Sequence, residues 1–295
     1  MGKGLDAFWE LLFPSDLYCI CCGNIIDNFK PYTLCEECLE KIRWVGERTC
    51  KVCGKIMADD NPNDVCRDCE HTEHFFDKGF TCMVYGKREK EMVHKFKYNG
   101  AAYMSSSLGL IMLERIQQEL GIQELSVQDL TSEGLSSNRL TSKELALNGL
   151  TSKEMALNGL TLKEVVPNPS ELLGFDLVTA VPMHPKKQRK RGYNQAELLA
   201  KVVAKGLGIA YNNRVLKREY YKNPMNKLGA EQRHKNIVGA YGKGSCKPSV
   251  LNGKRVLLID DVYTTGSTAD ECSRLLKEQG ADKVYVLTLA AGVGD

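Results

Sequence analysis

Four Cys-x-x-Cys pairs near the start of the chain constrain its fold more than any other feature of the sequence. Ten of the twelve cysteines lie before residue 83, so they are not spread along the chain as in a disulfide framework. Twelve residues separate the two pairs in each half of this segment. The paired residues are Cys19, Cys22, Cys35, Cys38, Cys50, Cys53, Cys66 and Cys69. Because each pair can direct two thiolates at one tetrahedral ion, two pairs close a four-cysteine zinc site.

The spacing predicts a double zinc ribbon at residues 19–70 with two structural zinc sites. Disulfides in an exported protein are the alternative, but the first residues contain no apolar run of signal-peptide length. Sequential pairing of the Cys-x-x-Cys turns is the simpler arrangement, and a cross-braced one stays open. Four thiolates fill the coordination of zinc, so neither site is expected to be catalytic. Cys21, His71 and His74 lie close to the ligands and could replace one, but we expect them to be spectators.

Strand-like and helix-like segments alternate after the ribbon. The expected strands are 78–85, 175–182, 255–262 and 283–290, and the expected helices are 88–97, 102–120, 195–208 and 267–279. Strands that alternate with helices predict a parallel sheet with right-handed crossovers, which is an α/β fold.

Two further segments stand apart from this pattern. Residues 1–18 predict a short amphipathic helix that packs on the body of the protein. Ten-residue units such as LTSKELALNG and LTSKEMALNG repeat from Leu130 to Pro169. We therefore expect a mobile or weakly helical surface insertion at 121–171 within a domain that spans 75–295. No run of 18 apolar residues occurs, so we expect no membrane span and a cytoplasmic protein.

An apolar strand runs directly into two acids in VLLIDDVYTTGST, residues 256–268. Adjacent carboxylates repel and acids are poor strand formers, and segments that break local rules in this way often mark functional sites. In parallel sheets, ligands bind at the carboxyl ends of the strands. The loop after the acids offers backbone N–H groups, hydroxyls and a helix N-terminus, which bind phosphate. Since the acids can accept hydrogen bonds from sugar hydroxyls or hold hydrated Mg²⁺, this order predicts a ribose-5-phosphate site.

The same stretch resembles the phosphoribosyl pyrophosphate (PRPP) motif of type I phosphoribosyltransferases. The wider chain is similar to the ComF competence-protein family, which joins an N-terminal double zinc ribbon to a phosphoribosyltransferase domain. The resemblance covers nearly everything except the decapeptide segment. It implies a type I phosphoribosyltransferase-like sheet flanked by helices, with PRPP and Mg²⁺ as ligands. The implied chemistry is departure of pyrophosphate from C1 through an oxocarbenium-like state, and no segment indicates the acceptor.

Residue by residue, the resemblance implies catalytic roles for Asp260, Asp261 and Arg191, and it places a lysine usual in the family at Lys97. The implied PRPP-binding residues are Val181, Pro182, Met183, His184, Asp260, Asp261, Thr264, Thr265, Gly266, Ser267 and Thr268. NPMNKLGAEQRHKNIVGAY resembles a flexible loop over the site, and the expected loop residues are Asn226, Leu228, Arg233 and Asn236. Leu228, Arg233, Asn236 and Gly239-Ala240-Tyr241 are in register with the family. Asn226 stands where the family commonly has glutamine.

Positive charge is concentrated in the C-terminal half. From Lys186 to Lys235 there are fourteen Lys and Arg residues and three acids, whereas the segment from Cys19 to Cys69 has seven bases and nine acids. This distribution favours an anionic partner of the C-terminal half, such as a polyphosphate or nucleic acid. The candidate nucleic-acid contacts are Lys186, Lys187, Arg189, Lys190 and Arg191. A solvated, charged helix start is the alternative interpretation of this cluster.

The resemblance leads to one main hypothesis with two alternatives. The main hypothesis is a PRPP-binding protein that assists uptake or handling of single-stranded DNA in natural transformation, with a DNA-uptake helicase or another competence protein as a partner. An active phosphoribosyltransferase that acts on an unidentified base or amine is the first alternative. A regulator that senses PRPP without catalysis is the second.

Overall fold

The computed structural model describes residues 17–26, 30–46, 48–58, 61–98, 100–120, 174–220, 237 and 239–294. Almost all of the expected N-terminal helix and the decapeptide insertion therefore lie outside the described residues. The four residues expected in the flexible loop, Asn226, Leu228, Arg233 and Asn236, lie outside them as well.

The described elements follow the predicted alternation closely. The helices are α2 (Glu36–Lys41), α3 (Arg67–Glu70), α4 (Lys87–Tyr98), α5 (Ser105–Glu119), α11 (Pro185–Arg191), α12 (Gln195–Leu207) and α14 (Ser267–Lys277). The strands are β1 (Lys78–Val84), β2 (Leu177–Ala180), β3 (Leu216–Arg218), β4 (Tyr241–Lys243), β5 (Arg255–Tyr263) and β6 (Lys283–Ala291). Short 3₁₀ turns span Pro31–Thr33, Ala102–Met104 and Pro248–Val250. Gly208 ends α12 in the left-handed conformation, with φ of 66°, as expected for a glycine stop.

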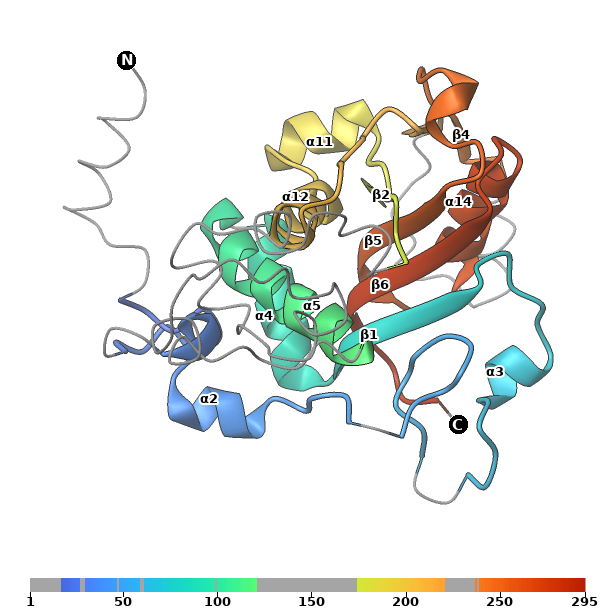
Figure 1. Ribbon diagram of the computed structural model, residues 1–295. Helices are drawn as coiled ribbons and strands as arrows, with labels where there is room; N and C mark the ends of the chain where they lie inside the picture. Colours follow the sequence, from blue (N-terminus) through green and yellow to red (C-terminus); the bar gives the residue numbers. More distant parts are fainter. Residues whose placement is uncertain are drawn as a thin grey trace, which may run out of the picture.

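The central sheet has four strands in the order β1-β6-β5-β2, and all of its pairs are parallel. The predicted α/β fold is therefore confirmed. A separate antiparallel pair, β3-β4, lies beside α14 (Figure 1). Strand β6 lies between β1 and β5, so the last strand along the chain completes the sheet.

Helices cover both faces of this sheet, and alternate residues of β5 face opposite cores. Leu257 and Ile259 belong to the core under α4, α5 and α12, whereas Val256 and Leu258 belong to the core under α14 and the β3-β4 pair. Figure 1 shows α4, α5 and α12 on one side of the sheet and α14 on the other. Because both faces are covered, β5 is a continuous apolar run up to Asp260.

The zinc-ribbon segment packs directly against the sheet. The Gly79 backbone N–H, in β1, donates to the Val52 carbonyl oxygen at 2.7 Å. A Cβ on Gly79 would lie 2.5 Å from the Cys53 carbonyl oxygen, so only glycine permits this approach. At the other end of the chain, Gly294 forms a bridge with Met57. No helix among the described residues has the length and apolar character needed to span a membrane.

Candidate functional site

The eight paired cysteines form two four-thiolate clusters. One cluster is Cys19, Cys22, Cys35 and Cys38, and the other is Cys50, Cys53, Cys66 and Cys69, with the ligand atoms of each within 4.8 Å of one another. The Cys22–Cys35 and Cys53–Cys66 sulfur separations are both 3.7 Å. A tetrahedral zinc ion with Zn–S distances of about 2.3 Å requires sulfurs about 3.8 Å apart. Both clusters therefore fit structural zinc, and the structure pairs the turns sequentially.

Backbone N–H groups support the sulfurs in the same way in both ribbons. The Cys35 N–H lies 3.4 Å from the Cys19 sulfur, and the Cys66 N–H lies 3.3 Å from the Cys50 sulfur. The clusters differ in burial: Cys22 is exposed, whereas three ligands of the second cluster are at most 1% exposed. Cys21 is buried and lies outside both clusters, as expected of a spectator.

The ends of β2 and β5 bring two predicted segments together at the carboxyl edge of the sheet. Ala180 is the register partner of Ile259, and the next backbone N–H, of Val181, donates to the Ile259 carbonyl oxygen at 2.9 Å. The segment from Val181 to His184 therefore starts beside the two acids. This adjacency could not be read from the sequence, where about 75 residues separate the two strands.

Asp261 is paired with a lysine from a third element. The Lys97 ammonium, in the last turn of α4, lies 2.9 Å from Asp261 Oδ1, and both side chains are largely buried. Burial by itself would lower the pKa of Lys97, but the Asp261 carboxylate outweighs that effect and the pKa is raised. The lysine that the family resemblance singled out thus contacts the acidic pair directly.

Asp260 is in a different environment from its neighbour. Burial, followed by the adjacent Asp261 carboxylate, raises the pKa of Asp260 from its ordinary value of 3.8 to about 7. Asp260 Oδ1 also accepts a hydrogen bond from the Asp261 backbone N–H at 2.8 Å, which favours the ionised form. Its charge raises the pKa of the buried Cys272 thiol in α14, after the larger effect of burial. Near neutral pH the acidic pair is therefore poised to gain or lose one proton.

A cluster of cations surrounds the acids. Burial, and then the charges of Arg191 and Arg218, lower the pKa of Lys187. Lys97 contributes to the same lowering and Asp261 opposes it, which places all of these groups within electrostatic reach of one another. Arg218 also donates to the Tyr241 hydroxyl at 2.9 Å. Sequence reasoning did not single out Arg218, which comes from a three-residue strand without a recognisable motif, whereas Tyr241 ends the segment that resembles the family's flexible loop.

The sequence Arg191-Gly-Tyr-Asn-Gln195 joins the β2 loop to the end of α4. The Asn194 amide donates to the Val181 carbonyl oxygen at 3.0 Å, and the Tyr193 hydroxyl donates to the Phe96 carbonyl oxygen at 2.7 Å. Arg191 donates to Gln195 Oε1 at 2.6 Å, and its guanidinium lies 4.7 Å from the centre of the Tyr98 ring. This stretch therefore holds the segment after β2 in place.

The predicted phosphate loop lies between β5 and α14. Gly266 is the N-cap of α14 with φ of 79°, and a Cβ there would lie 2.3 Å from the Tyr263 hydroxyl. The position therefore requires glycine. The Thr265 and Ser267 hydroxyls lie 3.0 Å apart. The first N–H groups of an α-helix have no partner within the helix, so this turn presents donors to an anion.

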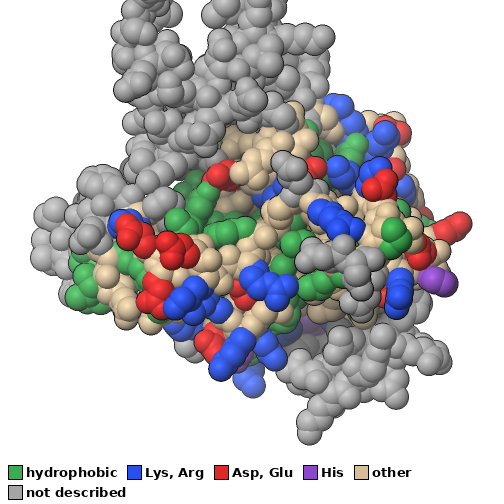
Figure 2. Space-filling model, turned by 90° about the horizontal axis from the view of Figure 1, so that it is seen from below, with side chains coloured by type: hydrophobic (Ala, Val, Ile, Leu, Met, Phe, Trp, Pro, Cys, Tyr) green, Lys and Arg blue, Asp and Glu red, His purple; other side chains and the backbone are tan. Residues whose placement is uncertain are grey.

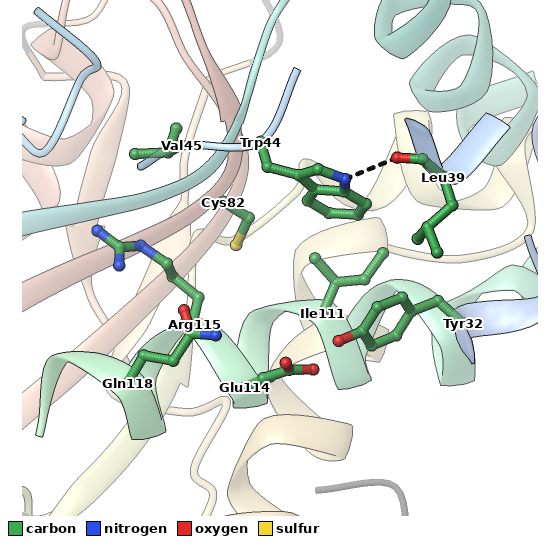
Figure 3. Close-up of a pocket in the computed structure, with 9 residues that line it drawn as sticks. All are labelled: Tyr32, Leu39, Trp44, Val45, Cys82, Ile111, Glu114, Arg115 and Gln118. Carbon is green, nitrogen blue, oxygen red and sulfur yellow. Dashed lines mark hydrogen bonds between the residues drawn. The ribbon is translucent and has the colours of Figure 1, made fainter. Parts of the chain in front are cut away.

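A cavity of about 300 Å³ lies elsewhere, between the first ribbon, β1 and α5 (Figure 3). Tyr32, Trp44 and Cys82 line it, and no residue of the β2 or β5 loops does. Two of its polar groups have partners within the protein: the Trp44 indole donates to the Leu39 carbonyl oxygen at 2.9 Å, and Arg115 Nε donates to the Thr81 carbonyl oxygen at 3.0 Å. The cavity therefore lies at the interface between ribbon and sheet. It is a weaker candidate for the functional site than the carboxyl edge of the sheet.

Comparisons with known proteins agree with this architecture. Residues 8–70 match the double zinc ribbon domain family, and residues 193–293 match the phosphoribosyl transferase domain family. The chain is 36% identical to Competence protein F of Haemophilus influenzae over 115 residues, which are 39% of this chain and 50% of that protein. Over this part the chain is similar to a competence protein.

Two other relatives carry related names. The chain is 34% identical to Competence protein ComFC of Streptococcus pneumoniae, over 37% of this chain and 45% of that protein. It is 32% identical to DNA utilization protein YhgH of Salmonella typhi, over 39% of this chain and 48% of that protein. The chain thus spans about half the length of the curated relatives it matches.

Solved structures show a weaker likeness to this chain. Glutamine PRPP amidotransferase from B. subtilis is 23% identical, with a TM-score of 0.27 over 39% of this chain and 22% of that chain. TT1426 from Thermus thermophilus is 14% identical, with a TM-score of 0.25 over 42% of this chain and 69% of that chain. Scores at this level do not bear on the function.

Proposed function

We propose that this protein binds PRPP with Mg²⁺ at the carboxyl edge of the sheet, and that it assists the handling of single-stranded DNA during uptake. The observation that carries the first part is the meeting of three features at one edge: the acids of β5, the loop after β2 and the Lys97 ammonium. Names of relatives, "competence" and "DNA utilization", support the second part. A cytoplasmic location fits eight zinc-binding thiolates, which need a reducing compartment.

In this proposal the acids accept hydrogen bonds from the ribose hydroxyls, and the turn from Thr264 to Thr268 donates backbone N–H groups to the 5′-phosphate. The segment from Val181 to His184 contacts pyrophosphate. Lys187 and Arg191 neutralise charge that gathers on the leaving pyrophosphate. Bound Mg²⁺ would supply further charge neutralisation at the pyrophosphate.

Calorimetry with PRPP and Mg²⁺ tests this directly. We expect wild-type protein to bind and Asp261→Asn to bind about 10- to 100-fold more weakly, because a hydrogen bond to a charged group contributes about 1.5–3 kcal/mol. Asp282→Asn is the matched control, because Asp282 is exposed before β6, at the opposite end of the sheet. Failure of the wild-type protein to bind PRPP would refute the proposal.

Binding alone does not separate a transferase from a sensor. If the protein is an active phosphoribosyltransferase, a screen of bases and amines with PRPP will find an acceptor that releases pyrophosphate. If it is a PRPP-sensing regulator, PRPP binds without turnover. We favour binding over any named acceptor, because the proposal gives roles to residues at phosphate and sugar but to none at a base.

The second part of the proposal rests on the outer face of α11. Lys186, Arg189 and Lys190 are exposed, whereas Lys187 and Arg191 are partly buried, and Lys187 lies within electrostatic reach of Asp261. The five basic residues thus divide between a solvent face and the PRPP site. Tyr98 and Tyr103 are 57% and 59% exposed, and Arg191 lies over the Tyr98 ring. Exposed aromatic rings beside cations are typical of surfaces that bind single strands.

The ribbons are a less suitable surface for nucleic acid. Figure 2 shows acidic and basic side chains intermixed on the face seen from below in Figure 1, where the ribbon segment lies. Mixed charge gives little net attraction to a phosphate backbone. The seven bases and nine acids between Cys19 and Cys69 agree with this.

Salt-dependent binding of a fluorescent single-stranded oligonucleotide tests the DNA role. We expect a triple variant with Lys186, Arg189 and Lys190 changed to Gln to bind more weakly and to reduce the slope of log K against log salt by about 2, because each phosphate contact in a single strand contributes about 0.7. A triple variant with the exposed Lys217, Lys254 and Lys283 changed to Gln matches the loss of charge elsewhere on the surface. Equal slopes in the two variants would refute a contact at α11.

A further inference from the structure

His74 joins the second zinc cluster to the helix that follows the phosphate loop. Its ring Nε2 lies 3.3 Å from the Cys69 sulfur, and its Nδ1 lies 2.9 and 3.0 Å from the two carboxylate oxygens of Asp270. The His74 side chain is 3% exposed and that of Asp270 is 13% exposed. A single buried ring therefore contacts both a zinc ligand and α14.

Asp270 sits where the geometry of the phosphate turn is set. It lies in the first turn of α14, and its backbone N–H donates to the Gly266 carbonyl oxygen at 2.8 Å. Its carboxylate also accepts a hydrogen bond from the Phe75 backbone N–H at 3.1 Å. The carboxylate thus fixes the segment after the ribbon and the start of α14 to each other.

Aromatic packing extends the contact under the loop itself. The His74 ring stacks on Phe76 with centroids 4.6 Å apart, and Phe76 meets the Tyr263 ring edge-on at 6.2 Å. Tyr263 is 5% exposed and lies against Gly266. A Cβ on Gly266 would lie 3.4 Å from His74 Cε1, so the turn closes directly over this layer. The ammonium of Lys55, a residue of the second ribbon, lies 5.6 Å from the Tyr263 ring centre.

The first zinc cluster has a different contact. Arg88, in the first turn of α4, donates to the Cys38 sulfur at 3.3 Å. That contact leads to α4 and not to α14. The first zinc can therefore serve as an internal reference within the same molecule.

We propose that His74 is a positioning residue that couples zinc in the second cluster to phosphate binding by residues 264–268. Outer partners of metal ligands orient those ligands, and their loss typically changes metal affinity by about 10- to 100-fold. Coupling between two sites is reciprocal, so zinc strengthens phosphate binding by the same factor by which phosphate strengthens zinc binding. The phosphate half of this inference rests on the proposed PRPP function.

The test compares His74→Gln with His71→Gln in the full-length, zinc-loaded protein. His71 lies in the same segment but is exposed, and its ring contacts the Arg67 carbonyl oxygen at 2.8 Å. Zinc release to a coloured chelator is followed with and without PRPP and Mg²⁺. We expect PRPP to slow one of the two release phases in wild type and His71→Gln. In His74→Gln that phase is expected to be about tenfold faster and unaffected by PRPP.

Hydrogen exchange of the backbone amides at 264–268 supplies a readout that needs no ligand. We expect faster exchange there in His74→Gln and in Asp270→Asn, with both zinc ions still bound at the start. If His74→Gln releases zinc in the same phases as wild type and its amides at 264–268 exchange at the wild-type rate, the coupling is overturned even if PRPP binds. If wild type fails to bind PRPP while His74→Gln loosens the loop and speeds release of one zinc, the ligand assignment fails and the link between ribbon and loop stands.

Discussion

Cys53→Ser is expected to abolish the cooperative unfolding transition of the protein, whereas Cys22→Ser is expected to leave a folded chain with weakened zinc binding. Cys53 is 1% exposed, and its cluster belongs to the core that contains Tyr263 and Val286. Structural zinc contributes about 10–16 kcal/mol in zinc-finger peptides, which is as large as the whole stability of a typical domain, about 5–15 kcal/mol. Losing the second zinc therefore removes the support of the sheet as well as the ribbon.

Cys22 is the informative comparison because it is an exposed ligand. Solvent can take its place at the ion, and three thiolates remain. Zinc content by mass spectrometry and thermal unfolding by circular dichroism measure both effects. Cys246→Ser, at a cysteine outside both clusters, should retain two zinc ions and the wild-type transition. A cooperative wild-type transition in Cys53→Ser would contradict this view of the second ribbon.

Asp260→Asn is expected to make the protein more stable at pH 8 and to impair PRPP binding. Asp260 has a pKa of about 7 in the folded protein and an ordinary value of 3.8. Between these values the folded state binds more protons than the unfolded state, so the free energy of unfolding falls as pH rises through this window. Because asparagine does not ionise, Asp260→Asn removes this fall in the free energy of unfolding. We expect a gain of about 1–3 kcal/mol at pH 8, or a rise in Tm of a few degrees.

The same pKa predicts the pH dependence of binding. Only the ionised Asp260 carboxylate is a pure acceptor for ribose hydroxyls, so affinity for PRPP should rise between about pH 6 and 8 and then level off. The phosphate groups of PRPP titrate near pH 6 as well, and the pH dependence of the residual binding by Asp260→Asn measures their contribution without that of Asp260. Unfolding measurements at pH 6, 7 and 8 test the predicted stability, and calorimetry at the same pH values tests the predicted PRPP affinity. A variant less stable than wild type at pH 8 would show that the acid supports the fold.

The sequence predicted the elements well because they are local. The apolar run of β5, the glycine stop of α12 and the equal cysteine spacing each depend on residues within a short window. The α/β fold followed from their alternation. Sequential zinc pairing was the simpler of two arrangements, and only the three-dimensional positions of the sulfurs decided it.

The partners of the site were harder to predict because they are distant in sequence. Lys97 and Asp261 are 164 positions apart and meet only because α4 ends at the carboxyl edge of the sheet. His74 and Asp270 are separated by 196 positions. Asp270 belongs to no motif of the sequence, and His74 was expected to be a spectator of the zinc ligands. No local sequence pattern predicts either pair, because each pair depends on how segments distant in sequence pack against one another.

Strand order has a consequence for the synthesis of this protein. β1 emerges from the ribosome near residue 84, but its neighbour in the sheet is β6, which ends at Ala291. The ribbon can bind zinc early, yet β1 must wait for about two hundred further residues before it pairs. Contacts this distant in sequence form slowly and leave an unpaired strand edge exposed in the meantime. The edge of β1 that faces β6 therefore stays without its sheet partner until nearly the whole of this sequence has been synthesised.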